Sequence, residues 1–87
     1  MATITIENVS GIPNIVAQLR RAKNIRQGDL AKKLKVSRQT VSAIENGHYF
    51  PSLPLAFRIA EFFGLAIEEI FNFDSEAFKS AVDAELE

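Results

Sequence analysis

The sequence predicts an all-α domain, and three observations carry this prediction. Apolar residues recur at helical spacing, residues that start or stop helices stand between these runs, and the intervening connections are short. Ser37 and Ser52 lie where helix N-caps are needed, while Gly47 and Gly64 lie where helices should end. The pattern predicts five helices between residues 12 and 71.

The composition restricts the class of protein. A chain of 87 residues makes one small domain, and the absence of Cys excludes disulfides and thiolate metal sites and suits a reducing cytosol. No apolar run approaches the roughly 20 residues of a membrane span, and no signal pattern precedes the domain. We therefore expect a cytoplasmic protein with no membrane partner, no metal and no cofactor.

The net charge of −1 conceals a strong division along the chain. Residues 12–58 hold nine Lys or Arg against two acidic residues, whereas residues 59–87 hold one Lys against eight acidic residues. A local basic face, rather than the total charge, is what binds nucleic acid. The division therefore favours a nucleic-acid-binding first part, although two ordinary solvated surfaces would give the same count.

Residues 2–7 form a largely β-branched run in which polar and apolar side chains alternate, which predicts a short strand that needs a partner elsewhere. Pro13 suits the first turn of a helix. The inner stripe of that first helix is predicted to be Ile15, Val16, Leu19 and Ala22. Asn24 should then end the helix in the left-handed conformation, which Asn tolerates.

Two helices, over residues 27–34 and 38–46, are predicted to meet at a tight turn over residues 35–37. Their buried faces are given by Leu30, Ala31, Leu34, Val36, Val41 and Ile44. Ser37 caps the second of these helices. Arg38, Gln39, Ser42 and Ala43 then face away from its buried side. Arg and Gln can form paired hydrogen bonds with guanine and adenine edges in the DNA major groove.

The helix after Ser52 is apolar over most of its surface and should be central to the core, followed by a short helix over residues 67–71. Four aromatic side chains are expected in the core or at a dimer seam rather than in a ligand pocket: Phe62, Phe63, Phe71 and Phe73. Residues 71–73 are the candidate strand partner of residues 3–7. A last helix, capped by Asp74 or Ser75, carries Phe78, Val82 and Leu86; it either packs on the body or a partner, or frays beyond Val82.

The motif that starts at Gln27 reads QxxLAxxLxVSRQTVSxIENGxxxPSLxLAxxIAxFFGLxIEEIF. On these residues the region from 12 to 71 resembles the Xre-type helix-turn-helix domain, the five-helix unit of lambdoid phage repressors and Cro proteins. The resemblance implies a lambda-repressor-like fold. It also divides the chain into an arm (1–11), the domain (12–71) and a tail (72–87) that could form dimers.

The resemblance also implies roles for individual residues. Arg38, Gln39, Ser42 and Ala43 occupy base-facing positions. The positions expected at the DNA backbone are Arg26, Gln27, Ser37, Thr40, Asn46, His48 and Tyr49. Gln27 should also brace Gln39, and Arg20 should form a structural ion pair with Glu45. Departures from the family pattern, such as Lys35 where Gly is usual, Gly28 and the weak caps Arg26 and Ala66, affect local stability.

We therefore expect a homodimeric regulator, a repressor that binds a near-palindromic site on double-stranded DNA. The alternative is an antitoxin-type regulator that masks a partner protein through residues 72–87, and a restriction controller is a narrower option. The sequence contains no nucleophile paired with a plausible His base, no phosphate-binding Gly loop and no metal-ligand spacing, so an enzyme is not expected.

Overall fold

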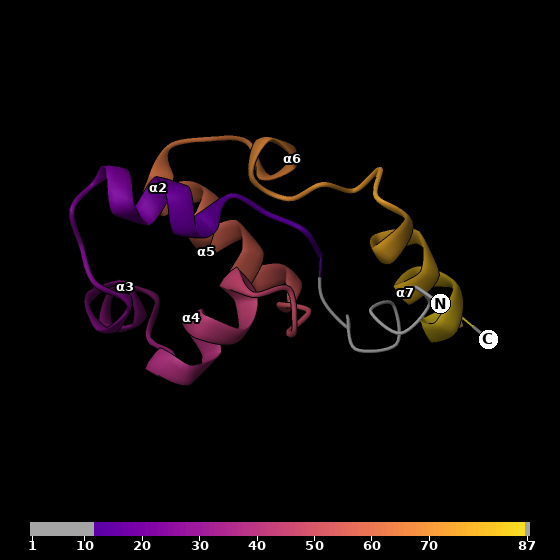
Figure 1. Ribbon diagram of the computed structural model, residues 1–87, viewed down its shortest axis with the longest axis horizontal. Coiled ribbons are helices and arrows are strands. Elements are labelled where there is room, and N and C mark those ends of the chain that lie inside the picture. Colours follow the sequence, from indigo (N-terminus) through magenta and orange to yellow (C-terminus); the bar gives the residue numbers. More distant parts are fainter. Residues whose placement is uncertain (1–11, 87) are drawn as a thin grey trace, which may run out of the picture.

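The computed structural model describes residues 12–86, which form six helices in succession (Figure 1). The helices are α2 (Val16–Ala22), α3 (Gln27–Leu34), α4 (Arg38–Glu45), α5 (Leu53–Phe63), α6 (Ile67–Ile70) and α7 (Glu76–Leu86). The predicted all-α class and the five helices between residues 12 and 71 are confirmed. None of the helices in the described part of the chain is both long and apolar enough to cross a bilayer.

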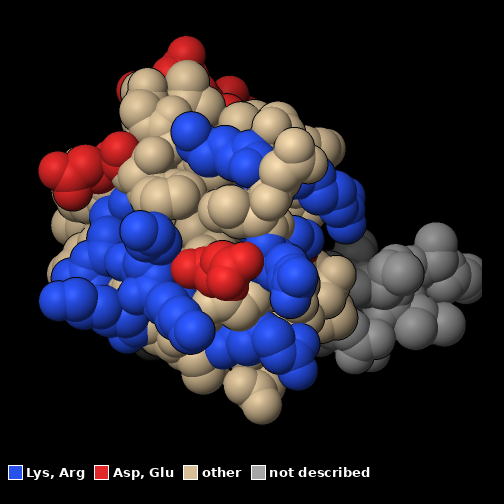
Figure 2. Space-filling view, turned by 90° about the vertical axis from the view of Figure 1, so that its left-hand side faces the viewer, with Lys and Arg blue, Asp and Glu red and all other residues tan. Residues whose placement is uncertain are grey.

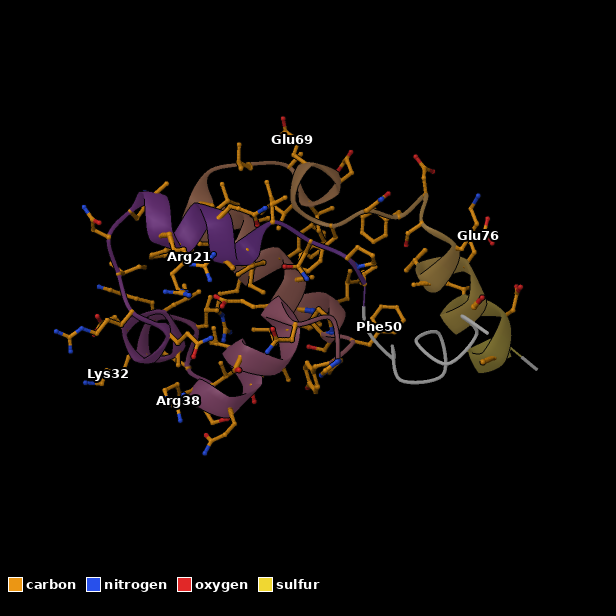
Figure 3. The ribbon with its side chains drawn as sticks, viewed as in Figure 1. Arg21, Lys32, Arg38, Phe50, Glu69 and Glu76 are labelled. Atoms are coloured by element: carbon orange, nitrogen blue, oxygen red, sulfur yellow. The ribbon has the colours of Figure 1, made fainter. Side chains whose placement is uncertain are left out.

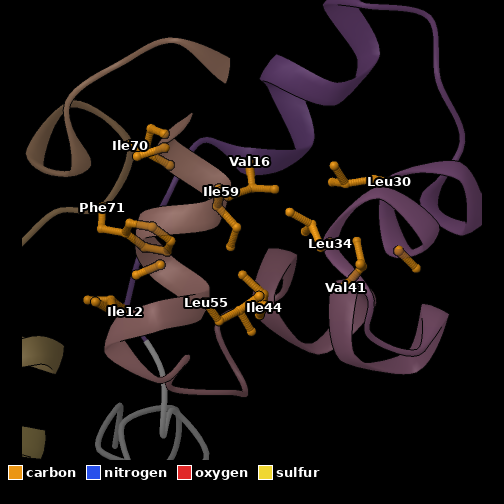
Figure 4. Close-up of a cluster of buried hydrophobic side chains, with 13 residues drawn as sticks. Ile12, Val16, Leu30, Leu34, Val41, Ile44, Leu55, Ile59, Ile70 and Phe71 are labelled. Carbon is orange, nitrogen blue, oxygen red and sulfur yellow. The ribbon is translucent and has the colours of Figure 1, made fainter. Parts of the chain in front are cut away.

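The five helices from α2 through α6 share one hydrophobic core (Figure 4). Helix α5 supplies Leu55, Ala56, Ile59 and Ala60 to it, as its broad apolar surface predicts. Ile59 and Leu30 have no exposed surface at all. The other buried apolar side chains are Ile12, Val16, Ala31, Leu34, Val41, Ile44, Ile70 and Phe71. The predicted inner faces of α3 and α4 therefore lie in the core.

The ends of the helices follow the predicted local chemistry. Ser37 Oγ accepts a hydrogen bond from Thr40 N (3.1 Å), and Ser52 Oγ accepts one from Leu55 N (3.2 Å). Asn24 ends the turn after α2 with a φ of 59°, as predicted. Lys35, at the turn between α3 and α4, has a φ of 62° and takes on the conformation that usually needs Gly.

The start of α2 differs from the prediction. The helix begins at Val16 rather than near Pro13, Ile15 is its 37 % exposed N-cap, and Ala22 is exposed. Asn14 sets this boundary, because its Oδ1 accepts from Val16 N (3.0 Å). Its Nδ2 donates to the carbonyl of Ile44 in α4 (2.8 Å), so one side chain ties the start of α2 to the end of α4.

The predicted strand over residues 71–73 does not form. Phe71 makes one isolated antiparallel bridge, and its partner is Asn14. The hydrogen bonds are from Ile15 N to the Ile70 carbonyl (3.0 Å) and from Asn72 N to the Pro13 carbonyl (2.8 Å). The chain then turns at residues 73–74, just before α7 begins. The proposed partner strand, residues 3–7, lies outside the described residues.

Helix α7 begins at the predicted cap. Ser75 Oγ accepts a hydrogen bond from Phe78 N (3.0 Å), and the Phe78 ring packs against the edge of the core. Figure 1 places α7 at the end of the molecule farthest from α3. The predicted packing of the tail on the body is thus made through Phe78.

Candidate nucleic-acid interface

Helix α4 presents a polar face on a buried apolar base. Val41 and Ile44 are each 1 % exposed, whereas Arg38 and Gln39 are exposed in its first turn. Ser42 and Ala43 are half-buried one turn later. Arg38 and Gln39 can supply guanidinium and amide groups. Ser42 and Ala43 are small, so the surface that they form permits close approach. This is the side-chain set that reads base edges when a helix enters a major groove.

A chain of side-chain hydrogen bonds supports this face from below. Arg20 Nε donates to Glu45 Oε2 (2.7 Å), and its second nitrogen donates to Glu45 Oε1 (3.2 Å). The third donor of Arg20 reaches the Ile25 carbonyl (2.9 Å). The Arg20 and Glu45 side chains are 11 % and 5 % exposed. The hydrogen bond to Glu45 raises the pKa of Arg20 above its ordinary value, with the carboxylate charge adding to the effect.

Gln27 extends this chain to the surface. Its Nε2 donates to Glu45 Oε1 (3.0 Å), and its Oε1 accepts from Arg38 (3.5 Å). The side chain that Gln27 braces is therefore Arg38, one residue before the predicted Gln39. The Gln27 amide lies between Glu45 and Arg38 and is hydrogen-bonded to both. The exposed guanidinium is thereby connected to the buried ion pair through one amide.

A wide groove of about 740 Å³ lies beside these residues, at the corner between α2 and α3. Its basic lining side chains are Arg20, Arg21, Arg26, Lys32 and Arg38. Figure 2 shows Lys and Arg gathered over this end, around a small acidic area. In Figure 3, Lys32 and Arg38 lie at this end, whereas Glu69 and Glu76 lie away from it. Lys and Arg of the first part of the chain therefore gather at one end, while Glu69 and Glu76 of the second part lie away from it.

The residues expected at the DNA backbone fall into two groups. Arg26 and Gln27 line the groove at the first turn of α3. The Ser37 and Thr40 hydroxyls are hydrogen-bonded to each other at 2.9 Å. At the other end of α4, Asn46 Nδ2 donates to Ser42 Oγ (3.4 Å), and His48 and Tyr49 follow on an exposed loop. The two groups lie towards opposite ends of α4.

Sequence reasoning missed two contributions to this site. Asn14 holds the last turn of α4 through the Ile44 carbonyl, although only its position before a helix gave any signal. Arg21 is exposed on α2, and its place in the basic groove depends on how α2 packs against α3. Lys32 of α3 also lines the groove.

Comparison with known proteins identifies this arrangement. The sequence pattern described as helix-turn-helix matches residues 16–70, which is more than half of the chain. The chain belongs to the helix-turn-helix family. The match includes α2 to α6 and excludes α7, so the family domain ends where the Phe71 bridge closes the core. The Xre-type resemblance seen in the motif from Gln27 onward is thereby confirmed.

Individual relatives agree with this assignment. An uncharacterized HTH-type transcriptional regulator of Methanocaldococcus jannaschii is 56 % identical over 63 residues, which are 72 % of this chain and 96 % of that protein. One from Archaeoglobus fulgidus is 44 % identical over 61 residues, 70 % of this chain and 86 % of the relative. The crystal structure of a transcriptional regulator from Listeria innocua has a TM-score of 0.62 at 21 % identity, over 82 % of this chain and 72 % of its own, and so supports the fold.

Proposed function

We propose that this helix-turn-helix protein binds a near-palindromic DNA operator as a homodimer and represses transcription there. The observation that carries the proposal is Arg38, exposed at the start of α4 and held by Gln27. A guanidinium at this position can form two hydrogen bonds with a guanine edge in the major groove. Arg38, Gln39, Ser42 and Ala43 would then face the bases.

The backbone contacts would come from both sides of α4. Arg26, Gln27, Ser37 and Thr40 would hold one phosphate run, and Asn46, His48 and Tyr49 would hold the other. Such contacts fix the register of the helix in the groove without reading sequence. Arg20 and Glu45 would act by keeping α2, α3 and α4 in place, since they form the buried pair of the network.

An exposed apolar face of α5 supports the homodimer. Leu53 is 65 % exposed and Phe57 is 58 % exposed, one helical turn apart. Phe57 also lines a groove of about 480 Å³, whose apolar wall includes Leu65 and Ile67. A two-fold interface must be self-complementary, and a protruding ring beside an apolar groove allows each copy to fill the groove of the other. Two copies of α4 would then enter major grooves about 34 Å apart.

Repression needs nothing further from the domain, because a protein that occupies an operator excludes other proteins from it. A reporter gene whose promoter carries the operator tests whether the protein represses or activates transcription. Expression should fall when this protein is produced and should recover with Arg38→Ala, whereas a rise in expression would identify an activator.

Selection of bound duplexes from a random pool tests DNA recognition itself. The expected result is a near-palindrome with half-sites about 10 base pairs apart. Its affinity should fall with salt at a logarithmic slope of about −0.9 for each neutralised phosphate. Binding to no duplex, or binding independent of salt, would refute the proposal. A selected sequence without two-fold symmetry would refute the homodimer.

The alternative, a protein partner bound through residues 72–87, is supported by the position of α7. This helix follows the family domain and exposes Glu76 and Asp83, while Phe78 faces the body. A partner that co-purifies in fixed stoichiometry, and is lost with Glu76→Lys and Asp83→Lys together, would establish this function. Loss of DNA binding by Arg38→Ala with partner binding unchanged would show that the two functions are separate.

A further inference from the structure

Four phenylalanine rings connect the core to the loop that follows α4. Phe71 is 1 % exposed and lies 6.5 Å from Phe73, measured between ring centroids. Phe73 lies 5.0 Å from Phe78 of α7, and Phe78 lies 5.7 Å from Phe50. The last two pairs are edge-to-face, with interplanar angles of 72° and 73°, which is a favourable arrangement for aromatic rings.

The row of rings joins a segment inside the region that matches the family to a segment outside it. Phe50 belongs to the region that matches the family, whereas Phe73 and Phe78 lie beyond it. In Figure 3, Phe50 points from the loop toward α7. Phe50 therefore packs on α7 through its contact with Phe78. Phe50 remains 37 % exposed, and the Phe78 ring covers one edge of it.

The loop that Phe50 ends is the one proposed to contact the DNA backbone. At its start, Gly47 N donates to the Ile44 carbonyl (3.0 Å) and His48 N donates to the Ala43 carbonyl (2.8 Å). These bonds fix the loop to the end of α4. His48 and Tyr49 then stand exposed between this attachment and the Phe50 ring. A contact at Phe50 therefore restrains the two residues from their other side.

We propose that α7 positions this loop for DNA through the contact between Phe78 and Phe50, so that DNA affinity depends on the docking of α7. The inference rests on the proposed function of the loop. Its physical basis is preorganisation, since a loop already held in its bound conformation loses less entropy on binding. Anything that draws α7 away from the body would then weaken operator binding without touching the DNA face.

A double-mutant cycle tests this coupling with Phe50→Ala, Phe78→Ala and the double variant. Each single change should lower affinity for the selected operator about fivefold, and the double variant should bind no more weakly than either single one. Amide exchange provides a second measurement in the absence of DNA. The His48 amide should exchange faster in Phe78→Ala than in the unaltered protein, because its loop is less restrained.

Phe62→Ala is the matched control. Phe62 is another half-buried ring in an edge-to-face pair, with Phe63 at 5.0 Å; it packs against the core, and Lys23 at the end of α2 lies over its ring. This variant should lose stability while the His48 amide and the operator affinity remain unchanged. Phe78→Leu replaces Phe78→Ala if the latter fails to fold, since it keeps apolar bulk against the core and loses the aromatic edge.

Two results separate this inference from the function on which it rests. If the unaltered protein binds no duplex, both are refuted. If it binds and Arg38→Ala binds more weakly, but Phe78→Ala binds as well as the unaltered protein, only the coupling is refuted. Multiplicative effects of Phe50→Ala and Phe78→Ala would also refute it, because Phe50 would then act on DNA independently of α7.

Discussion

Replacing Arg20 with Ala removes every hydrogen bond that this side chain makes, two to Glu45 and one to the Ile25 carbonyl. Glu45 is 5 % exposed, so its carboxylate stays buried and keeps only the donor from Gln27. Breaking a buried ion pair from one side costs about 3–5 kcal/mol. The remaining Gln27 donor places the expected loss of unfolding free energy at the low end, about 3 kcal/mol.

Urea denaturation followed by far-UV circular dichroism measures this loss. For a domain of this size, about 3 kcal/mol corresponds to a fall in melting temperature of at least about 12 °C. Arg21→Ala is the matched control, because Arg21 is the next residue of α2 and is exposed. Its effect should stay within about 0.5 kcal/mol. The loss of operator affinity should be secondary to the loss of stability, since Arg20 reaches Arg38 only through Glu45 and Gln27.

The double variant Arg20→Ala/Glu45→Ala distinguishes a buried charge from lost packing. Removing the carboxylate as well should restore at least about 1 kcal/mol relative to Arg20→Ala, because no unpaired charge then remains buried. A double variant less stable than Arg20→Ala, or an Arg20→Ala protein as stable as the unaltered one, would contradict this reasoning.

Three further outcomes are expected. Arg38→Ala should cost about 1–3 kcal/mol of operator affinity and relax selection at one base pair per half-site in a repeated duplex selection, whereas loss spread evenly over all duplexes would mean a phosphate contact. Lys35→Gly should raise the unfolding free energy by about 1 kcal/mol in urea, because the φ of 62° costs Gly nothing; an unchanged midpoint would show that the turn stores no strain. Phe57→Glu should convert the proposed homodimer to monomer in sedimentation experiments and weaken binding to the full operator more than to a half-site, while a persisting dimer would place the interface elsewhere.

The parts of the fold that local chemistry specifies could be predicted from the sequence. The pair α3 and α4, their buried faces, the Ser37 and Ser52 caps and the left-handed Asn24 all depend on residues close in the chain. The ion pair of Arg20 and Glu45 came from the family resemblance, because nothing local indicates a contact across 25 positions.

The errors have a common physical origin in contacts between distant segments. Asn14 sets the start of α2 partly by bonding the Ile44 carbonyl, 30 positions away. Phe71 bridges Asn14 because α6 returns the chain to the start of the domain, which strand propensity cannot indicate. Phe50 packs on Phe78 for the same reason. At the candidate site, the side-chain types were predictable, but the partner of Gln27 required the packing of α3 on α4.

The separation of charge between the two ends of the molecule has a consequence for how it meets DNA. The described residues extend over 37 Å along the longest axis, several times the screening length of about 8 Å at physiological salt. The acidic end therefore does not cancel the attraction of the basic end for a polyanion. The basic end is drawn towards the duplex, while the acidic end, several screening lengths away, is hardly affected by the duplex field. Collisions would then be biased towards those in which α4 arrives first.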